Sequence, residues 1–251
     1  MTYKLKADYV FLGEGAADNA LIRRLSEIRD LPVFDCPFPD GIRPQKKDKK
    51  NGETVSKDRE AVGGRDNFGE MLKLLDPVID EQRSTRGILI ATDCGDDGKK
   101  AFDSVAKQVA ATGFYPRPEK PGQAVSANAK QSVYLPKLVI VMVPGKDKIG
   151  GLETLCVEVL RDRHPQTAEC LDQYLACLDG KGVGIDDWGA ETRSKAEMQC
   201  LIAVTNKNDP NKAGRYVFST QKGGKPPVID VTHPAFDALA DDLKKAIAAL
   251  S

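Results

Sequence analysis

The sequence predicts an α/β protein with a mostly parallel sheet flanked by helices and a largely helical C-terminal extension. Three observations support this prediction. Short apolar strands alternate with amphipathic helices over roughly the first 165 residues. Residues 138–143 form an unbroken apolar run, which is typical of a strand covered on both faces. Beyond residue 165, apolar side chains recur at the spacing of helices.

The individual elements follow from periodicity and from the glycines and prolines that separate them. Strands are expected at residues 8–12, 32–35, 87–92 and 138–143. Helices are expected at residues 17–28, 68–79, 101–109, 152–163, 170–178, 195–204 and 235–250. Two hairpins are also expected, around residues 131–135 and 215–231.

This pattern divides the chain into a core at residues 1–165 and a helical extension at residues 166–251 that packs on it. A charged insertion at about residues 37–66 interrupts the core and has few large apolar side chains. Residues 41–60 contain seven Lys or Arg against four acids, a local net charge of +3. A solvated loop is the simpler interpretation. A flexible basic arm that touches a phosphate backbone or a partner is the functional one.

Bulk composition excludes some classes of protein. Lys plus Arg and Asp plus Glu both number 37, so there is no global basic signal for nucleic acid or membrane, although a local basic face remains compatible. The six cysteines form no C-x-x-C pair and the two histidines have no partner at zinc-site spacing, so we expect reduced thiols and no His/Cys metal site. With no secretory pattern and no apolar run long enough to span a bilayer, we expect a cytoplasmic protein without membrane attachment.

Acidic residues follow three of the expected strands. They are Glu14 after the first strand, Asp93, Asp96 and Asp97 after the third, and Asp147 and Glu153 after the fourth. Because the carboxyl ends of parallel strands lie at one edge of a sheet, we expect these acids to meet there. Neighbouring carboxylates repel each other and are costly to desolvate, so a shared divalent cation would make the cluster tolerable. Mg²⁺ prefers such oxygen ligands, and two ions of this kind support phosphodiester cleavage.

Other interpretations of the same residues are simpler. Asp96 or Asp97 at the start of a helix is also explained as an N-cap, and Glu14 as a turn residue. A dinucleotide-binding G-x-G-x-x-G turn is broken by Asp18, and neither a P-loop nor a G-x-S-x-G elbow occurs. Cys94 is a poor nucleophile because its acidic neighbours raise a thiol pKa.

The order of these motifs resembles a Toprim domain, the metal-binding catalytic core of topoisomerases, bacterial primases and several nucleases. More closely, the chain resembles small Toprim proteins related to the overcoming-lysogenisation-defect (OLD) nucleases. The resemblance covers about residues 7–205. It rests on EGAAD from Glu14, ATDCGDDG from Ala91, the stretch Gly64–Phe68, the stretch Gly150–Glu153 and Lys195 in a downstream helix.

The resemblance implies roles for particular residues. The implied catalytic residues are Glu14, as metal ligand or general base, Asp93, as metal ligand, and Lys195, which would neutralise phosphate charge in the transition state. The implied ligands of Mg²⁺ or Mn²⁺ are Glu14, Asp93, Asp96, Asp97 and Glu153, with Asp18 as a supporting acid. The sequence departs from the Asp-x-Asp pattern of the family, because Gly95 displaces the second acid to Asp96.

The leading hypothesis is therefore a metal-dependent Toprim nuclease that cleaves DNA or RNA. The resemblance also implies phage defence beside an ATPase partner. The displaced acid supports a second hypothesis, a catalytically degenerate Toprim module that binds a partner protein or nucleic acid through the basic insertion. A small-molecule phosphotransferase or phosphatase is a third hypothesis, disfavoured because neither a P-loop nor a D-x-D-x-[TV] motif occurs. The C-terminal helices also leave a homo-oligomer open.

Overall fold

A four-stranded sheet forms the centre of the computed structural model, which describes residues 5–36, 46–47, 54–55, 62–128, 134–207, 209–212, 214–221 and 223–251. Its strands are β1 (Tyr9–Gly13), β2 (Phe34–Asp35), β5 (Gly87–Asp93) and β6 (Lys137–Val143). They lie in the order β2-β1-β5-β6, and every neighbouring pair is parallel. The predicted α/β fold with a parallel sheet is confirmed.

Seven α-helices accompany this sheet in the described residues. They are α1 (Ala16–Ile28), α2 (Phe68–Gln82), α3 (Gly98–Ala111), α4 (Leu152–Arg163), α5 (Pro165–Asp179), α6 (Ala190–Thr205) and α7 (Asp237–Leu250). Short 3-10 helices add η1 (Arg65–Asn67), η2 (Ile185–Asp187), η3 (Gly214–Phe218) and η4 (Pro234–Phe236). Each helix expected from periodicity is present, and several begin three to five residues earlier than expected.

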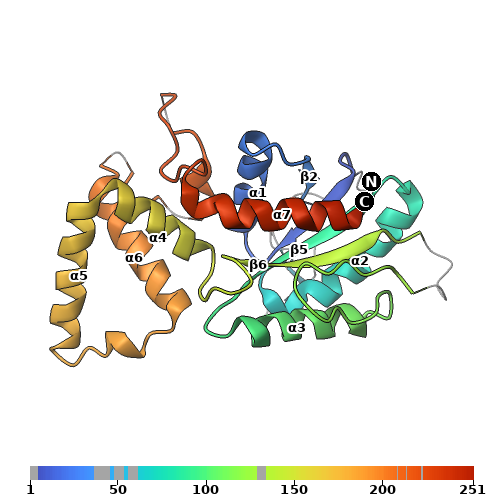
Figure 1. Ribbon diagram of the computed structural model, residues 1–251, viewed down its shortest axis with the longest axis horizontal. Coiled ribbons are helices and arrows are strands. Elements are labelled where there is room, and N and C mark those ends of the chain that lie inside the picture. Colours follow the sequence, from blue (N-terminus) through green and yellow to red (C-terminus); the bar gives the residue numbers. More distant parts are fainter. Residues whose placement is uncertain are drawn as a thin grey trace.

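The strands bury alternate side chains on the two faces of the sheet, as the pleat requires. In β5, Leu89 and Ala91 join the cluster on the face covered by α1 and α7, whereas Ile88 and Ile90 join the cluster with α2 and α3. The strand β6 alternates in the same way, and both of its faces are buried. This explains why its sequence is an unbroken apolar run. The helical layers on either side of the sheet are visible in Figure 1.

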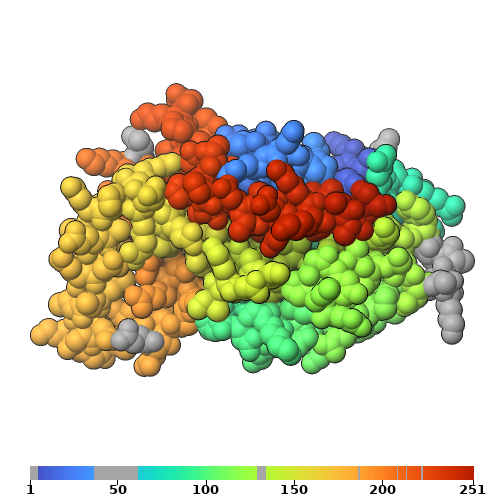
Figure 2. Space-filling model, viewed as in Figure 1, coloured from blue at the N-terminus to red at the C-terminus, as the bar shows by residue number. Residues whose placement is uncertain are grey.

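The C-terminal part of the chain contributes to the same core. Helices α4, α5 and α6 lie together beyond the carboxyl edge of the sheet, and α7 crosses back over β6 and β5 (Figure 1). At its end, Leu250 sits so close to Gly87 that a Cβ on this glycine would lie 2.6 Å from Leu250 Cδ1. Figure 2 shows α7 as a continuous ridge on the surface, so one face of this helix is buried and the other is exposed.

One expectation for an irregular segment is corrected, and a second falls partly outside the described residues. The hairpin expected around residues 215–231 is absent from the described residues there. Instead, the chain forms η3, an isolated bridge between Gln221 and Lys225, and one hydrogen bond from Ile229 N to Val217 O. Pro226 and Pro227 lack the amide N–H that a ladder needs, which explains the short pairing. Residues 131–133 of the other expected hairpin lie outside the described residues.

Most of the expected insertion at 37–66 also lies outside the described residues. Within it, β3 (Lys46–Lys47) and β4 (Thr54–Val55) form a short antiparallel pair. Its last residues belong to the packed core, because Val62 is fully buried and the amides of Gly63 and Gly64 donate to Glu14 O at 3.0 and 3.1 Å. In the part of the chain that the structure describes, none of the helices combines the length and the apolar composition needed to cross a bilayer.

Candidate functional site

The carboxyl edge of the sheet brings three loops together. The turn after β5 is joined to the loop before α4 by reciprocal hydrogen bonds between Gly95 and Gly150, at 2.8 Å and 2.6 Å. Cys94 N also donates to Val143 O at 2.8 Å, at the end of β6. The residues after β1, β5 and β6 therefore lie at one edge of the sheet, as the parallel topology predicts.

Glu14 lies at the centre of this edge and is already compensated by hydrogen-bond donors. Its Oε1 accepts from Arg65 Nε at 3.1 Å, from Asp93 N at 3.0 Å and from the Thr92 hydroxyl. Arg65 also donates to Asp93 O at 2.7 Å. One guanidinium thus links the ends of β1 and β5 and offsets the charge of Glu14.

Asp93 is the last residue of β5, and its side chain lies at the start of α4. Its Oδ1 accepts from Leu152 N at 3.1 Å. The approach requires glycine at position 151, because a Cβ there would lie 2.7 Å from Asp93 Cγ. Burial, followed by the negative charges of Asp18 and Glu14, raises the pKa of Asp93 to about 9.

Asp18 is the most buried acid of the group, with 8% of its surface exposed. Its Oδ2 accepts from Gly15 N at 2.7 Å at the start of α1. Burial raises the pKa of Asp18 to about 7, and the charges of Glu14 and Glu153 add to this effect against the Gly15 hydrogen bond. The sequence interpretation gave Asp18 only a supporting role, whereas the structure sets it among the central acids.

Helices α4 and α6 complete the cluster. Burial, together with the charges of Glu191 and Glu14, raises the pKa of Glu153 in the first turn of α4. Lys195 Nζ pairs with Glu191 one turn earlier on α6, and half of the Lys195 side chain is exposed. Burial lowers the pKa of Lys195, but the Glu191 hydrogen bond and the charges of Glu153 and Asp93 outweigh it and raise the pKa. Lys195 is therefore a stable cation facing the acids.

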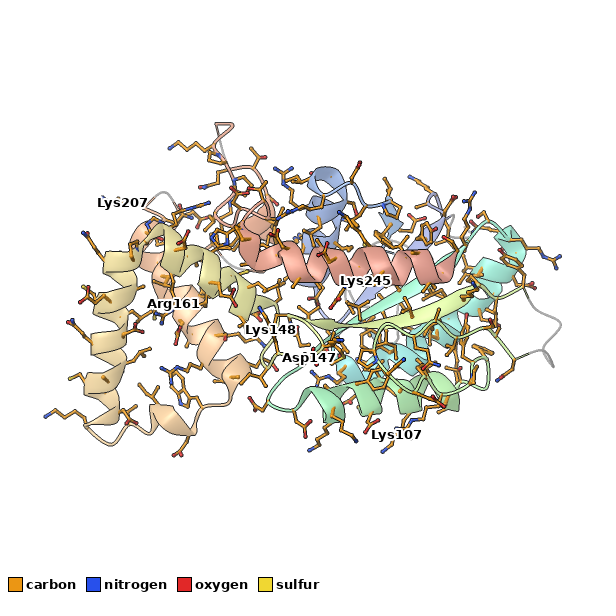
Figure 3. All side chains as sticks on the ribbon, in the orientation of Figure 1. Lys107, Asp147, Lys148, Arg161, Lys207 and Lys245 are labelled. Atoms are coloured by element: carbon orange, nitrogen blue, oxygen red, sulfur yellow. The ribbon has the colours of Figure 1, made fainter. Side chains whose placement is uncertain are left out.

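Two predicted ligands are held elsewhere. Asp97 caps α3, because its Oδ1 accepts from Lys100 N at 2.9 Å. Asp96 accepts from Ala190 N at 2.6 Å and so holds the start of α6. Between Asp93 and these acids the chain turns at Gly95, whose φ of +58° lies in the left-handed region. Asp147, labelled in Figure 3, lies in the loop between β6 and α4 and has 86% of its side chain exposed.

The structure thus brings together Glu14, Asp93, Glu153 and Lys195 from the predicted set, and it leaves Asp96 and Asp97 in capping roles. The sequence model of one family, described as a protein of unknown function (DUF3226), matches residues 8–247. The chain belongs to the DUF3226 family. No curated protein and no solved structure matches this chain.

The match runs from the start of the sheet almost to the end of α7, so the acidic edge and the C-terminal helices both lie in the DUF3226 unit. The description of the family carries no activity. The Toprim resemblance and the nuclease activity that it implies therefore stay predictions.

Three residues at this edge of the sheet were not predicted as site residues from the sequence. Arg65 lies in the Gly64–Phe68 stretch noted for the resemblance, but the charge pattern assigned it to the insertion. Thr92 lies within an expected strand, and its sequence context gives no sign of a role in the site. Glu191 precedes Lys195 by four residues, a spacing that puts an acid and a lysine on one helix face and offered a usable signal.

The donors of this edge are carboxylate oxygens, which suit a hard cation such as Mg²⁺ or Mn²⁺. Within the residues that the structure describes, no three Asp, Glu, His or Cys side chains already lie in an arrangement that could hold a metal ion. Loading would require Glu14 to exchange its contact with Arg65, and Asp93 to lose a proton, because burial and neighbouring acids keep the pKa of Asp93 high. The donor chemistry fits a divalent cation, and the contacts identify what must move to admit it.

Proposed function

We propose that this DUF3226 protein is a divalent-metal-dependent nuclease that hydrolyses phosphodiester bonds in DNA or RNA. One observation carries the proposal: Glu14, Asp18, Asp93 and Glu153 converge on one partly buried edge of a parallel sheet, from the ends of β1 and β5 and the first turns of α1 and α4. Burial and mutual repulsion raise the pKa of Asp18, Asp93 and Glu153. Such a cluster is costly to ionise unless a cation joins it, and perturbed carboxyls of this kind gather at functional sites.

The roles follow from the contacts. Glu14, Asp93 and Glu153 would hold Mg²⁺ or Mn²⁺, with Asp18 beside them. A bound ion of this type activates water and stabilises the leaving oxygen of a phosphodiester. Lys195, half-exposed on α6 and facing Glu153 and Asp93, is suited to neutralise charge on the transferring phosphate. Arg65 offsets the negative charge of Glu14 when no cation is bound.

The decisive experiment compares Asp93→Asn with Asp97→Asn. Both keep the shape of the side chain, and asparagine retains an oxygen for the Leu152 N–H or the Lys100 N–H. With labelled single- and double-stranded DNA and RNA in Mn²⁺, we expect Asp93→Asn to lose cleavage by at least about 100-fold. We expect Asp97→Asn to cleave like the wild type.

Calorimetry with Mn²⁺ provides a separate readout that needs no substrate. We expect binding by the wild type and by Asp97→Asn, and none by Asp93→Asn. Cleavage that persists unchanged in Asp93→Asn would show that the activity does not come from this edge. A wild type that neither binds Mn²⁺ nor cleaves any polymer would defeat the nuclease proposal.

One observation favours a second candidate function. Asp96, the acid displaced by Gly95, accepts the Ala190 N–H at the start of α6, so the second acid position of the Toprim pattern has no acid from this turn. In the catalytically degenerate alternative, the protein binds a partner protein or nucleic acid without Mn²⁺ and without cleavage. The basic arm at 41–60 that this hypothesis invokes lies outside the described residues. A role in phage defence beside an ATPase partner comes from the Toprim resemblance and belongs to the proposal. A cytoplasmic place of action, expected from the absence of a secretory pattern, belongs to it as well.

A further inference from the structure

Arg65 places a guanidinium group inside the acidic edge. Its Nε donates to Glu14 Oε1 at 3.1 Å and to the Thr92 hydroxyl oxygen at 3.2 Å, and its Nη2 donates to Asp93 O at 2.7 Å. The Arg65 and Glu14 side chains are only 26% and 17% exposed, so this ion pair is screened less than a surface pair. The ends of β1 and β5 are thus held together by a cation that belongs to the chain itself.

The backbone of Arg65 is fixed beside Glu14. Gln108 on α3 donates through Nε2 to Arg65 O at 2.9 Å, and its Oε1 accepts from Gly69 N at 3.2 Å. The amides of residues 63–64, directly before Arg65, donate to Glu14 O. A change of partner by the Arg65 guanidinium therefore requires a rotation of its side chain alone.

A second carboxylate borders the same guanidinium. A Cβ on Gly95 would lie 3.8 and 3.9 Å from the two Nη atoms of Arg65, and 3.9 Å from Glu191 Oε2. Arg65 and Glu191 therefore both border the space that Gly95 leaves open by having no side chain. Glu191 Oε1 is paired with Lys195, whereas Oε2 accepts no hydrogen bond from the described residues. This oxygen is a ready acceptor for a guanidinium that leaves Glu14.

Arg65 and a divalent cation oppose each other at Glu14, because both are positively charged and both require its carboxylate oxygens. We propose that Arg65 is a tethered competitor of the divalent cation: it pairs with Glu14 when no cation is bound, and it turns to Glu191 when a cation takes Glu14. Arg65 thereby sets the cation concentration at which the acidic edge is loaded. Because the cation belongs to the proposed function, this inference rests on that function.

A competitor differs from a residue that only orients a metal ligand. An orienting group holds a ligating carboxylate by a hydrogen bond, and its loss weakens metal binding. The Thr92 hydroxyl and the Asp93 N–H already orient Glu14 Oε1 in this way, and neither carries a charge. The charge of Arg65 adds a repulsion that these neutral donors do not. Removal of the guanidinium should therefore strengthen metal binding, which is the opposite of the effect that an orienting role predicts.

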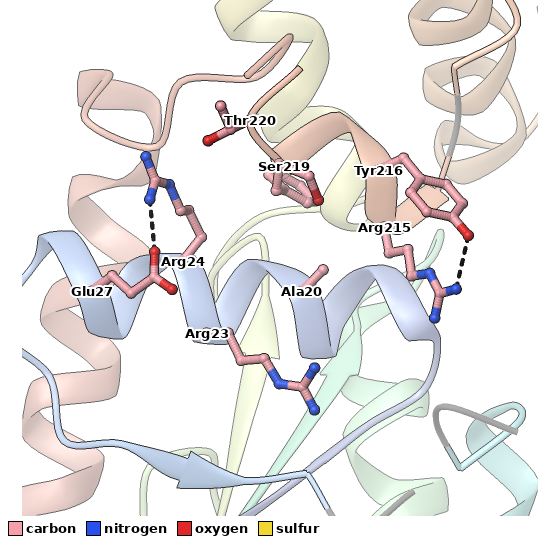
Figure 4. A pocket seen from close by; sticks show the side chains of 9 residues that line it. Ala20, Arg23, Arg24, Glu27, Arg215, Tyr216, Ser219 and Thr220 are labelled. Atoms are coloured by element: carbon pink, nitrogen blue, oxygen red, sulfur yellow. Dashed lines mark hydrogen bonds and ion pairs between the residues drawn. The ribbon is translucent and has the colours of Figure 1, made fainter. Parts of the chain in front are cut away.

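The test is calorimetry with Mn²⁺ on the wild type and on Arg65→Gln, which removes the charge and keeps a polar side chain. The matched control is Arg24→Gln. The Arg24 side chain is 32% exposed and forms a 2.7 Å ion pair with Glu27 on the outer side of α1, six residues beyond Asp18 (Figure 4). Circular dichroism checks that both variants are folded.

We expect Arg65→Gln to bind Mn²⁺ about 10- to 100-fold more tightly than the wild type, because the cation no longer has to break a charged hydrogen bond. We expect Arg24→Gln to bind Mn²⁺ like the wild type. Binding by Arg65→Gln that is equal to that of the wild type, or weaker, would overturn the proposal.

Melting temperatures provide a second readout. Because Arg65 compensates Glu14 only while no cation is bound, Arg65→Gln should melt at a lower temperature than the wild type in EDTA. Saturating Mn²⁺ should reduce this difference, since the cation binds the variant more tightly. An arginine that merely held the two strands together would lower the melting temperature equally in EDTA and in Mn²⁺, and that result would also count against competition.

A double-mutant cycle with Glu191→Gln tests the second position of Arg65. We expect Glu191→Gln to weaken Mn²⁺ binding by about 2- to 5-fold in the wild type, because the displaced guanidinium loses its new partner. In Arg65→Gln the same substitution should have a smaller effect. An equal effect in both backgrounds would show that Glu191 acts only through its charge on the cation, and would overturn Glu191 as the second position.

Cleavage assays separate this proposal from the nuclease proposal. If Arg65→Gln binds Mn²⁺ more tightly and neither protein cleaves any polymer, the nuclease proposal fails and the competition stands. If the wild type binds Mn²⁺ and cleaves, while Arg65→Gln binds no more tightly, the competition fails and the nuclease stands. Absence of Mn²⁺ binding by both proteins would defeat both proposals.

Discussion

Two opposing effects act on the protonation of the Asp93 carboxyl group. The Leu152 N–H at the start of α4 favours the ionised carboxylate, as helix N-termini generally do. Burial and the neighbouring acids Asp18, Glu14, Glu153 and Glu191 favour the neutral acid, and they prevail because the pKa of Asp93 rises to about 9. At neutral pH this carboxyl therefore carries a proton, and a divalent cation must displace it.

The raised pKa values of Asp18 and Asp93 predict how the stability of the protein depends on pH in EDTA. Asp18 and Asp93 have folded pKa values of about 7 and about 9, both above the ordinary value of 3.8, so the folded state holds more protons than the unfolded state. Their stabilising contribution is fully present below the ordinary value and is lost as pH rises through about 7 and about 9. We expect the melting temperature to fall between about pH 5 and pH 9, and Asp93→Asn to flatten the decline.

Addition of Mn²⁺ supplies the control for this prediction. The cation binds ionised carboxylates, so the stabilisation that it gives should grow over the same pH range. A melting temperature that rises with pH in EDTA, or that falls equally in the wild type and in Asp93→Asn, would contradict the assignment of these protons.

At the scale of elements, the spacing of apolar residues predicted the strands and helices. This spacing depends only on residues that are close together in the sequence. Alternation in β1 and β5 and the helical spacing in α1 are local signals, and parallel pairing then implied that the acids after the strands meet. The direction of Asp96 was not predictable in this way. Its carboxylate meets Ala190, and that contact depends on a turn at Gly95 and on a helix 94 residues further along the chain.

The start of α6 illustrates the same limit. The pattern predicted residue 195, whereas the helix begins at Ala190, where a distant aspartate accepts the N–H. Arg65 was missed for a related reason. Its charge resembled that of the basic insertion before it, and only the folded chain shows it in contact with Glu14. Local patterns predicted the elements, while contacts between distant segments determined which acids form the site.

The capping roles of Asp96 and Asp97 lead to a prediction at this scale. We expect Asp97→Ala and Asp96→Ala each to lower the free energy of unfolding by about 1 kcal/mol, because each leaves a helix-start N–H without its acceptor. We expect both variants to bind Mn²⁺ like the wild type. Urea denaturation and calorimetry measure the two quantities, and Asp97→Asn serves as the control that restores the cap. Loss of Mn²⁺ binding with unchanged stability would return these acids to the ligand set.

At the scale of the whole molecule, the C-terminal segment packs around the helix that carries Asp18. The acidic edge lies at the first turn of α1, and η3 packs against the same helix. The inner face of the same helix packs with α7 against the sheet. The C-terminal segment therefore supports the position of α1, since α7 packs against the inner face of this helix and η3 also packs on it.

The last prediction concerns this support. Leu243 of α7 is 2% exposed and lines a small pocket with Phe11, Ala91 and Val143, between α1 and the sheet. We expect Leu243→Ala to lower the free energy of unfolding by about 2–5 kcal/mol, because a buried cavity replaces the side chain. Val204→Ala, at a 63% exposed position on α6, should change it by less than about 0.5 kcal/mol.

The shape of the unfolding curve tests whether α7 unfolds together with the sheet. Because its apolar face shares one cluster with β1, β5 and β6, removal of Leu243 should weaken the whole protein in a single transition, detected equally by the far-ultraviolet signal and by the fluorescence of Trp188. If the C-terminal segment were instead a unit that folds by itself, Leu243→Ala would split the curve into two steps. The fluorescence step of Trp188, which precedes α6, would then separate from the loss of the sheet.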